Sequence, residues 1–149
     1  MTAAPALTRI FVFGSNLAGR HGKGDAFIAR QRHGAIYGQG EGLQGSSYGL
    51  PTKDAFIRSL PLAQVEKSVE RFLSFARTRP DLAFDVQAVG CRLAGFTPEQ
   101  IAPMFADAPE NVYLHEAFRV VLRAAGLRFN DSPLPPEQAE TIKQGAFDF

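Results

Sequence analysis

"FVFGSNLAGRHGKGDA" (residues 11–26) begins as an apolar run and then breaks into glycines. Gly14, Gly19, Gly22 and Gly24 fall within a span of eleven residues. An apolar run that ends in glycine predicts a buried strand over residues 9–14. A simple turn needs only one or two glycines, so this many indicate a backbone that comes close to something other than protein.

Helical patterns follow along the chain. Pro61 is expected at the first position of one helix, and Thr97 with Gln100 forms a capping-box pattern at the start of another. Gly34 and Gly126 are expected just after the ends of two further helices. The predicted helices cover residues 24–34, 61–79, 96–105 and 115–126.

Extended segments alternate with these helices. The pattern predicts strands over residues 48–54, 84–90 and 111–114, and a glycine-rich loop over residues 37–49. Strands that alternate with helices predict an α/β fold with a mixed, largely parallel sheet.

Composition indicates one globular domain. Of the 149 residues, 45% are hydrophobic and 21% are charged, and the formal net charge of +1 argues against bulk nucleic-acid binding. No apolar run approaches the length of a membrane span, and the first residues, MTAAPALTR, lack a signal-peptide pattern, so we expect no membrane partner and a cytoplasmic location. The domain is expected over residues 1–126. Residues 127–149 are expected to form a polar C-terminal tail, with a short helix after Pro136.

A second glycine cluster, GCRLAG (residues 90–95), also follows an apolar strand and precedes a helix. In an open α/β sheet this places both glycine clusters at the carboxyl ends of strands, where ligands bind. Glycine amides and a helix N-terminus suit an anion. The sequence therefore predicts two glycine loops around a phosphate or diphosphate.

Single residues leave alternatives open. The Asn16 amide suits a sugar hydroxyl or a turn, and Lys53–Asp54 suits a nucleophile with its partner or a solvated ion pair. Cys91 is either an activated thiolate or a packed small side chain. His21, His33 and His115 show no metal-ligand spacing with Cys91, so we expect surface or packing histidines and no metal or cofactor. Residues 19–25 do not match a P-loop, because Gly24 follows Lys23.

The order of these parts resembles a macrodomain, the ADP-ribose-binding α/β module. The matching segments are FVFGSNLAGRHGKGDAFIARQRHGA, GLQGSSYGLPTKD and VGCRLAGFTPEQIAPMF, and the resemblance covers roughly residues 8–122. The last two segments look most like the terminal ADP-ribose protein glycohydrolases. The chain is also similar to small macro-like proteins of bacteria and their phages. The resemblance implies a three-layer α/β/α fold.

The resemblance also implies roles for individual residues. Lys53 would attack the anomeric carbon of the ribose, and Asn16 would lie near the distal ribose. The family's acid–base aspartate belongs to the second loop, so in this chain Lys53 lacks that partner unless Asp54 or Asp25 substitutes for it. The catalytic candidates are therefore Lys53, Asn16 and Asp25. The ligand-binding candidates are Gly14, Ser15, Gly22, Lys23, Gly24, Thr52, Gly90, Cys91, Arg92, Leu93, Ala94 and Gly95.

Two departures from the family pattern bear on function. Ala94 stands where the catalytic branch has an aspartate, and no acidic residue precedes Arg9 to read an adenine amino group. The expected ligand is ADP-ribose, an ADP-ribosylated macromolecule, or an ADP-ribose-like nucleotide sugar with a different base or none. Hydrolysis through Lys53 and a non-catalytic binding role both remain open. A Rossmann-like nucleotide phosphoribohydrolase and an interaction protein with a vestigial cleft rank below them.

Overall fold

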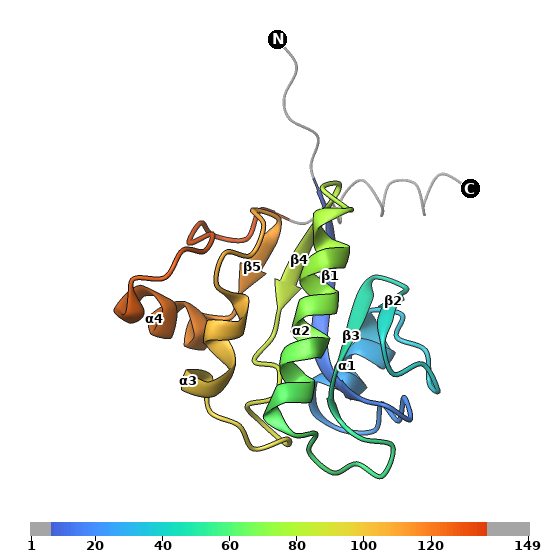
Figure 1. Ribbon diagram of the computed structural model, residues 1–149. Coiled ribbons are helices and arrows are strands. Elements are labelled where there is room, and N and C mark those ends of the chain that lie inside the picture. The colour runs from blue at the N-terminus through green and yellow to red at the C-terminus, as the bar shows by residue number, and fades with distance from the viewer. Residues whose placement is uncertain (1–6, 137–149) are drawn as a thin grey trace, which may run out of the picture.

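The computed structural model describes residues 7–136. Its centre is a five-stranded sheet in the order β2-β3-β1-β4-β5 (Figure 1). β1, β3, β4 and β5 run parallel, and the edge strand β2 pairs antiparallel to β3. The predicted α/β class with a mixed, largely parallel sheet is confirmed. The strands are β1 (Thr8–Asn16), β2 (Gly42–Gln44), β3 (Ser47–Lys53), β4 (Leu82–Val86) and β5 (Val112–Leu114).

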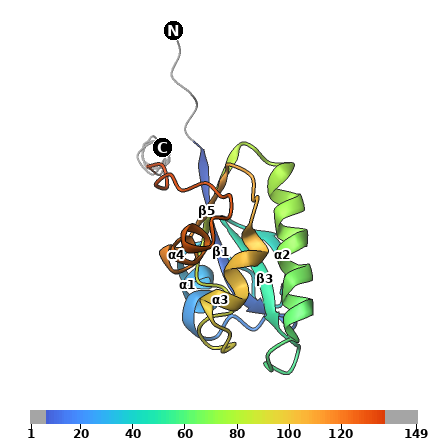
Figure 2. The ribbon, with the colours of Figure 1, turned by 60° about the vertical axis from the view of Figure 1, so that its left-hand side comes forward.

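Alternate residues of β1 face two different sets of helices. Ile10 and Val12 belong to the large core under α2, whereas Phe13 packs with Ala26 and Ala29 of α1. Figure 2 shows α1 and α2 on opposite sides of the sheet, and Figure 1 shows α3 and α4 beside β5. The helices are α1 (Gly24–Arg32), α2 (Leu62–Arg77), α3 (Pro98–Ile101), the 3₁₀ helix η1 (Ala102–Phe105) and α4 (Glu116–Ala125).

Phenylalanine rings form the centre of the large core. Phe72 of α2 packs edge-on against Tyr48 of β3 and Phe84 of β4, with ring centroids 5.0 and 5.3 Å apart. Phe105 of η1 stacks on Phe118 of α4 at 5.6 Å. Such rings bury a large apolar area and hold specific mutual orientations, so they fix α2, η1 and α4 against the sheet.

Most helix boundaries agree with the sequence. The Thr97 hydroxyl accepts from the Gln100 amide at 3.2 Å and the Gln100 side chain accepts from the Thr97 amide at 2.9 Å, which confirms the capping box. Gly34 and Gly126 have φ of 73° and 68° just beyond their helices, as expected of left-handed caps. Pro61 is the N-cap of α2 rather than its first residue.

The predicted loop over residues 37–49 is partly wrong. Residues 42–44 and 47–49 belong to β2 and β3, which form a hairpin around Gly45 and Ser46. Gly45 has φ of 61°, and a Cβ there would lie 2.6 Å from the Gly34 carbonyl oxygen. The hairpin therefore requires glycine, and that glycine content concealed the strands from a pattern based on apolar alternation.

The strand predicted over residues 84–90 lies earlier in the chain. β4 pairs with residues 8–12 of β1 and ends at Val86. The Gln87 amide still donates to the Val12 carbonyl at 3.0 Å, but the chain then turns away through Val89 and Gly90. β1 therefore extends past the end of β4, and this step in the sheet leaves space at its carboxyl edge.

Residues 127–136 lie against the domain. Phe129 packs on the large core, and the Asn130 side chain donates to the Glu110 carbonyl at 2.5 Å. The helix expected after Pro136 lies outside the described residues. Among residues 7–136 no helix is long and apolar enough to cross a bilayer.

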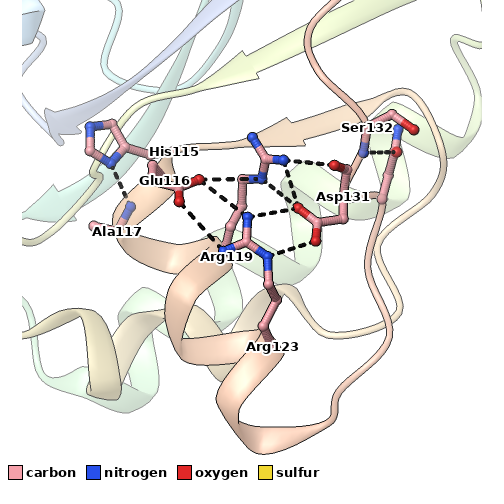
Figure 3. Close-up of polar contacts among 8 residues, drawn as sticks. His115, Glu116, Ala117, Arg119, Arg123, Asp131 and Ser132 are labelled. Carbon is pink, nitrogen blue, oxygen red and sulfur yellow. Dashed lines mark hydrogen bonds and ion pairs between the residues drawn. The ribbon is translucent and has the colours of Figure 1, made fainter.

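Asp131 fastens this segment to α4. Its carboxylate accepts from Arg119 at 2.6 and 2.8 Å and from Arg123 at 2.7 and 3.0 Å, and Glu116 flanks both arginines (Figure 3). These hydrogen bonds, from Arg123 first and then Arg119, lower the pKa of Asp131 to about 2.

We expect Asp131→Asn to lower the melting temperature at pH 7. Because the folded pKa lies below the usual value of about 3.9, the carboxylate stabilises the fold above that pH. The stabilisation by the carboxylate is lost as the pH falls through about 2. The difference in melting temperature between Asp131→Asn and wild type should therefore become smaller in that range. Melting curves between pH 7 and pH 2 measure this. Asp107→Asn is the control, because Asp107 is largely exposed and makes one ion pair, at 3.7 Å. An equal difference at every pH would contradict the role of the charge.

Candidate functional site

The cleft lies at the carboxyl edge of the sheet, beside β1. The chain leaves β1 toward α1 on one face, whereas the chains leaving β3 and β4 lead to α2 and α3 on the other face. Neighbouring connections that diverge in this way open a crevice at the strand ends, which is the usual ligand site of an open α/β sheet. A cavity of about 530 Å³ occupies this position, within the size range of small-molecule sites.

The two predicted glycine loops meet at this cavity. It is lined by residues 14–16 at the end of β1, 22–25 at the start of α1, 52 and 53 at the end of β3, and 90 and 92–94 after β4. Every candidate residue except Cys91 and Gly95 is among them. The structure therefore brings together segments that lie far apart in the sequence.

Some lining residues were missed. Arg20 follows the first strand, but nothing in the sequence distinguished it from a surface arginine. Ile57 lies in a short loop after Lys53 whose pattern carries no functional signal. Ala26, Ala88 and Val89 complete the lining, and their small or apolar side chains resemble ordinary core residues.

Basic side chains outnumber acidic ones in the cleft. Arg20, Lys23, Lys53 and Arg92 line it, and Asp25 is the one carboxylate among its lining residues. The Arg92 Nε lies 3.8 Å from an Asp25 carboxylate oxygen, and the arginine side chain is 58% exposed. An excess of cations in a concave site raises the local concentration of anions. The arrangement therefore suits an anionic ligand.

Asn16 is a turn residue as well as a lining residue. Its buried side chain accepts from the Arg20 amide and donates to the Arg20 carbonyl, both at 2.9 Å. These bonds close the turn that leads the chain out of β1. These bonds use one N–H and one lone pair of the amide, so the amide can still donate one hydrogen bond and accept another.

Asp54 shapes the loop that follows Lys53. Its carboxylate accepts from the amides of Phe56 at 2.8 Å and Arg58 at 3.0 Å. Hydrogen bonds from the backbone, with Arg58 the largest contribution, lower the pKa of Asp54 and keep it ionised. Asp54 is not among the lining residues of the cleft, whereas Asp25 and Lys53 both are. Asp25 is therefore the carboxylate that shares the cleft with Lys53.

Buried polar contacts support the first glycine loop from beneath. The His21 ring is fully buried, and its Nε2 lies 3.0 Å from the Gln39 carbonyl and 3.2 Å from the Gln44 side-chain oxygen. The Ser15 hydroxyl donates to the Gly40 carbonyl. His21 is thus a packing histidine. Within residues 7–136, no group of three or more His, Cys, Asp or Glu side chains is arranged to hold a metal.

Cys91 packs against the large core rather than lining the cleft. Burial, with a smaller contribution from Glu99, raises the pKa of its thiol to about 11. The thiol is therefore protonated at neutral pH, which favours the packing interpretation over an activated thiolate.

We expect iodoacetamide to label Cys91 slowly at pH 7 in the native protein and rapidly in denaturant. The reason is that the thiolate is the nucleophile and the folded protein disfavours it. Mass spectrometry over time measures the two rates, with free cysteine as the reference. Native labelling at the rate of free cysteine would contradict the packed assignment.

We compared the chain with protein-family models, with curated proteins and with solved structures, and none of the three comparisons gave a match. The functional argument therefore rests on the cleft.

Proposed function

We propose that the cleft binds ADP-ribose or a related nucleotide sugar, and that the chain is a macrodomain-like α/β/α module. The observation that carries this proposal is the convergence of both glycine loops and four basic residues on one cavity beside β1. Backbone amides and cations together suit a diphosphate. The segments that form the cleft are also those that resemble macrodomains, and this resemblance is the reason for proposing a nucleotide sugar as the ligand.

Gly22 gives the sharpest test of binding. It lines the cavity, its backbone lies outside the positive-φ region, and a Cβ there would meet no protein atom within 4 Å. A Cβ at this position therefore fits without a clash, and Gly22→Val places a branched side chain on the cleft lining. Gly24 is less suitable, because its φ of 59° would strain any larger residue.

We expect ADP-ribose to raise the melting temperature of wild type and to have little effect on Gly22→Val. A ligand at a hundred times its dissociation constant adds about 2.7 kcal/mol to the stability, which thermal shift detects easily. The same measurement with ADP, AMP, GDP and NAD shows which part of the ligand contributes to binding. An unliganded melting temperature equal to wild type shows that Gly22→Val folds. If none of these ligands shifts wild type, the binding proposal fails.

Catalysis is proposed through Lys53. Its amine would attack the anomeric carbon of the ribose, and the leaving group would depart with the bonding electron pair and a proton from Asp25 or water. The adduct would open to a Schiff base, and water would then release ADP-ribose and restore the amine. Residue 94 contributes only a methyl group to the cleft, and this favours the second candidate, a non-catalytic ADP-ribose-binding module.

Lys53→Ala separates these two functions. For an enzyme, we expect turnover of an ADP-ribosylated substrate to fall by roughly a hundredfold or more while ADP-ribose affinity stays within a few-fold, since a transition-state interaction is lost. Borohydride should trap an adduct on Lys53. Lys23→Ala is the matched control, because Lys23 lines the same cleft and should mainly affect affinity.

Ala94→Asp completes the comparison, because it adds a carboxylate to the cleft. We expect it to raise the activity of an enzyme that lacks this group. If wild type releases no ADP-ribose and Ala94→Asp gains no activity, the binding module is the correct function.

A further inference from the structure

The second glycine loop, residues 90–95, has few contacts that fix its position. Its ends are joined by its own backbone, because the Phe96 amide donates to the Gly90 carbonyl at 2.8 Å. Its packing is otherwise open. Leu93 is 61% exposed, and a Cβ at Gly95 would meet no atom beyond its chain neighbours within 4 Å. A loop with so few packing contacts needs another interaction to hold one conformation.

The Ser59 hydroxyl supplies that interaction. It donates to the Ala94 carbonyl at 2.5 Å, from an exposed position in the segment after β3. In the part of the chain that the structure describes, it is the one hydrogen bond that joins the second glycine loop to a segment distant in sequence. The ion pair between Arg92 and Asp25 is longer, at 3.8 Å, and its arginine side chain is 58% exposed. The hydrogen bond from Ser59 is therefore the main contact that fixes the loop.

The segment that carries Ser59 is itself held firmly. Lys53 and Ser59 form an antiparallel bridge, and the Leu60 amide donates to the Thr52 carbonyl at 2.9 Å. In the turn between them, the Asp54 carboxylate accepts from the amides two and four residues later, at 2.8 and 3.0 Å. These contacts attach Ser59 to the end of β3, so its hydroxyl is a fixed anchor for the second glycine loop.

The loop that Ser59 fixes carries backbone donors at the cleft. Residues 92–94 line the cavity, and within residues 7–136 their three amides donate to no backbone carbonyl. Gly90 and Gly95, at the two ends of the loop, have φ of 77° and 85°. Successive amides without backbone partners form an anion-binding concavity in loops of this kind. The position of the loop therefore decides whether these amides can act together on a phosphate.

We propose that Ser59 is a positioning residue, whose hydroxyl holds the second glycine loop, through the Ala94 carbonyl, in the arrangement that binds a phosphate. This inference rests on the proposed function. Because Ser59 pairs with Lys53, the same hydrogen bond sets the spacing between the phosphate-binding loop and the proposed nucleophile. Without it the loop populates other arrangements, and the apparent affinity falls in proportion to the fraction of molecules that keep the competent one.

Ser59→Ala removes the hydroxyl, and Ser59→Thr keeps it. For Ser59→Ala, we expect the affinities for ADP-ribose and for pyrophosphate, measured by calorimetry, to fall by a similar factor, roughly three- to tenfold. Because the hydrogen bond is exposed, the unliganded melting temperature should stay close to that of wild type. Ser59→Thr should retain the affinities of wild type. Pyrophosphate is included because it reports on the phosphate-binding groups alone.

Thr78→Ala is the matched control, because the exposed Thr78 hydroxyl donates to the Phe75 carbonyl at 2.7 Å, at the end of α2 and outside the cleft lining. It should change neither affinity. Three results would overturn the role of Ser59 while the proposed function stands: unchanged affinities in Ser59→Ala, a loss confined to ADP-ribose, or an equal loss in Ser59→Thr. A wild type that binds neither ligand overturns the proposed function itself, and this inference with it.

Discussion

β1 is hydrogen-bonded along both edges by parallel strands, and the position of the cleft depends on this constraint. The chain leaves β1 for α1 on one face of the sheet, whereas the chains leaving its two neighbours lead to α2 and α3 on the other face. The crevice beside the end of β1 follows from that divergence. β4 stops pairing at Val12 of β1, four residues before β1 ends at Asn16, and this difference in length deepens the crevice.

The two faces of the sheet contribute unequally to stability. The large core under α2 also includes residues of β5, η1 and α4, whereas α1 is held by a small cluster around Phe13, Ala26 and Ala29. The glycine loop that lines the cleft therefore leads into the less firmly packed helix. Buried contacts from His21, Gln39 and Gln44 compensate in part, because they fix the loop to the β2–β3 hairpin rather than to the core.

The sequence predicted the class of the fold and most of the cleft, because both depend on local patterns. Apolar runs that end in glycine locate strand ends, and strand ends meet at one edge of a parallel sheet. Cys91 shows the limit: its neighbours Gly90 and Arg92 line the cleft, but its own side chain turns to the core. Sequence position places a loop at the site without specifying which of its side chains face the ligand.

Ile57 shows the limit more clearly, because it lines the cleft with its backbone in the left-handed region. The segment DAFIRS contains no glycine, so its pattern gives no sign of a left-handed residue. The Asp54 carboxylate accepts hydrogen bonds from the amides two and four residues later, which are those on either side of Ile57. Asp54 thus acts on the cleft without lining it, since the turn that it stabilises links Lys53 at the strand end to Ile57 in the lining. Lys53 and Asp54 are adjacent in the sequence, but they do not act as one ion pair. Lys53 is a cation of the cleft lining, whereas the Asp54 carboxylate holds the loop that contains Ile57.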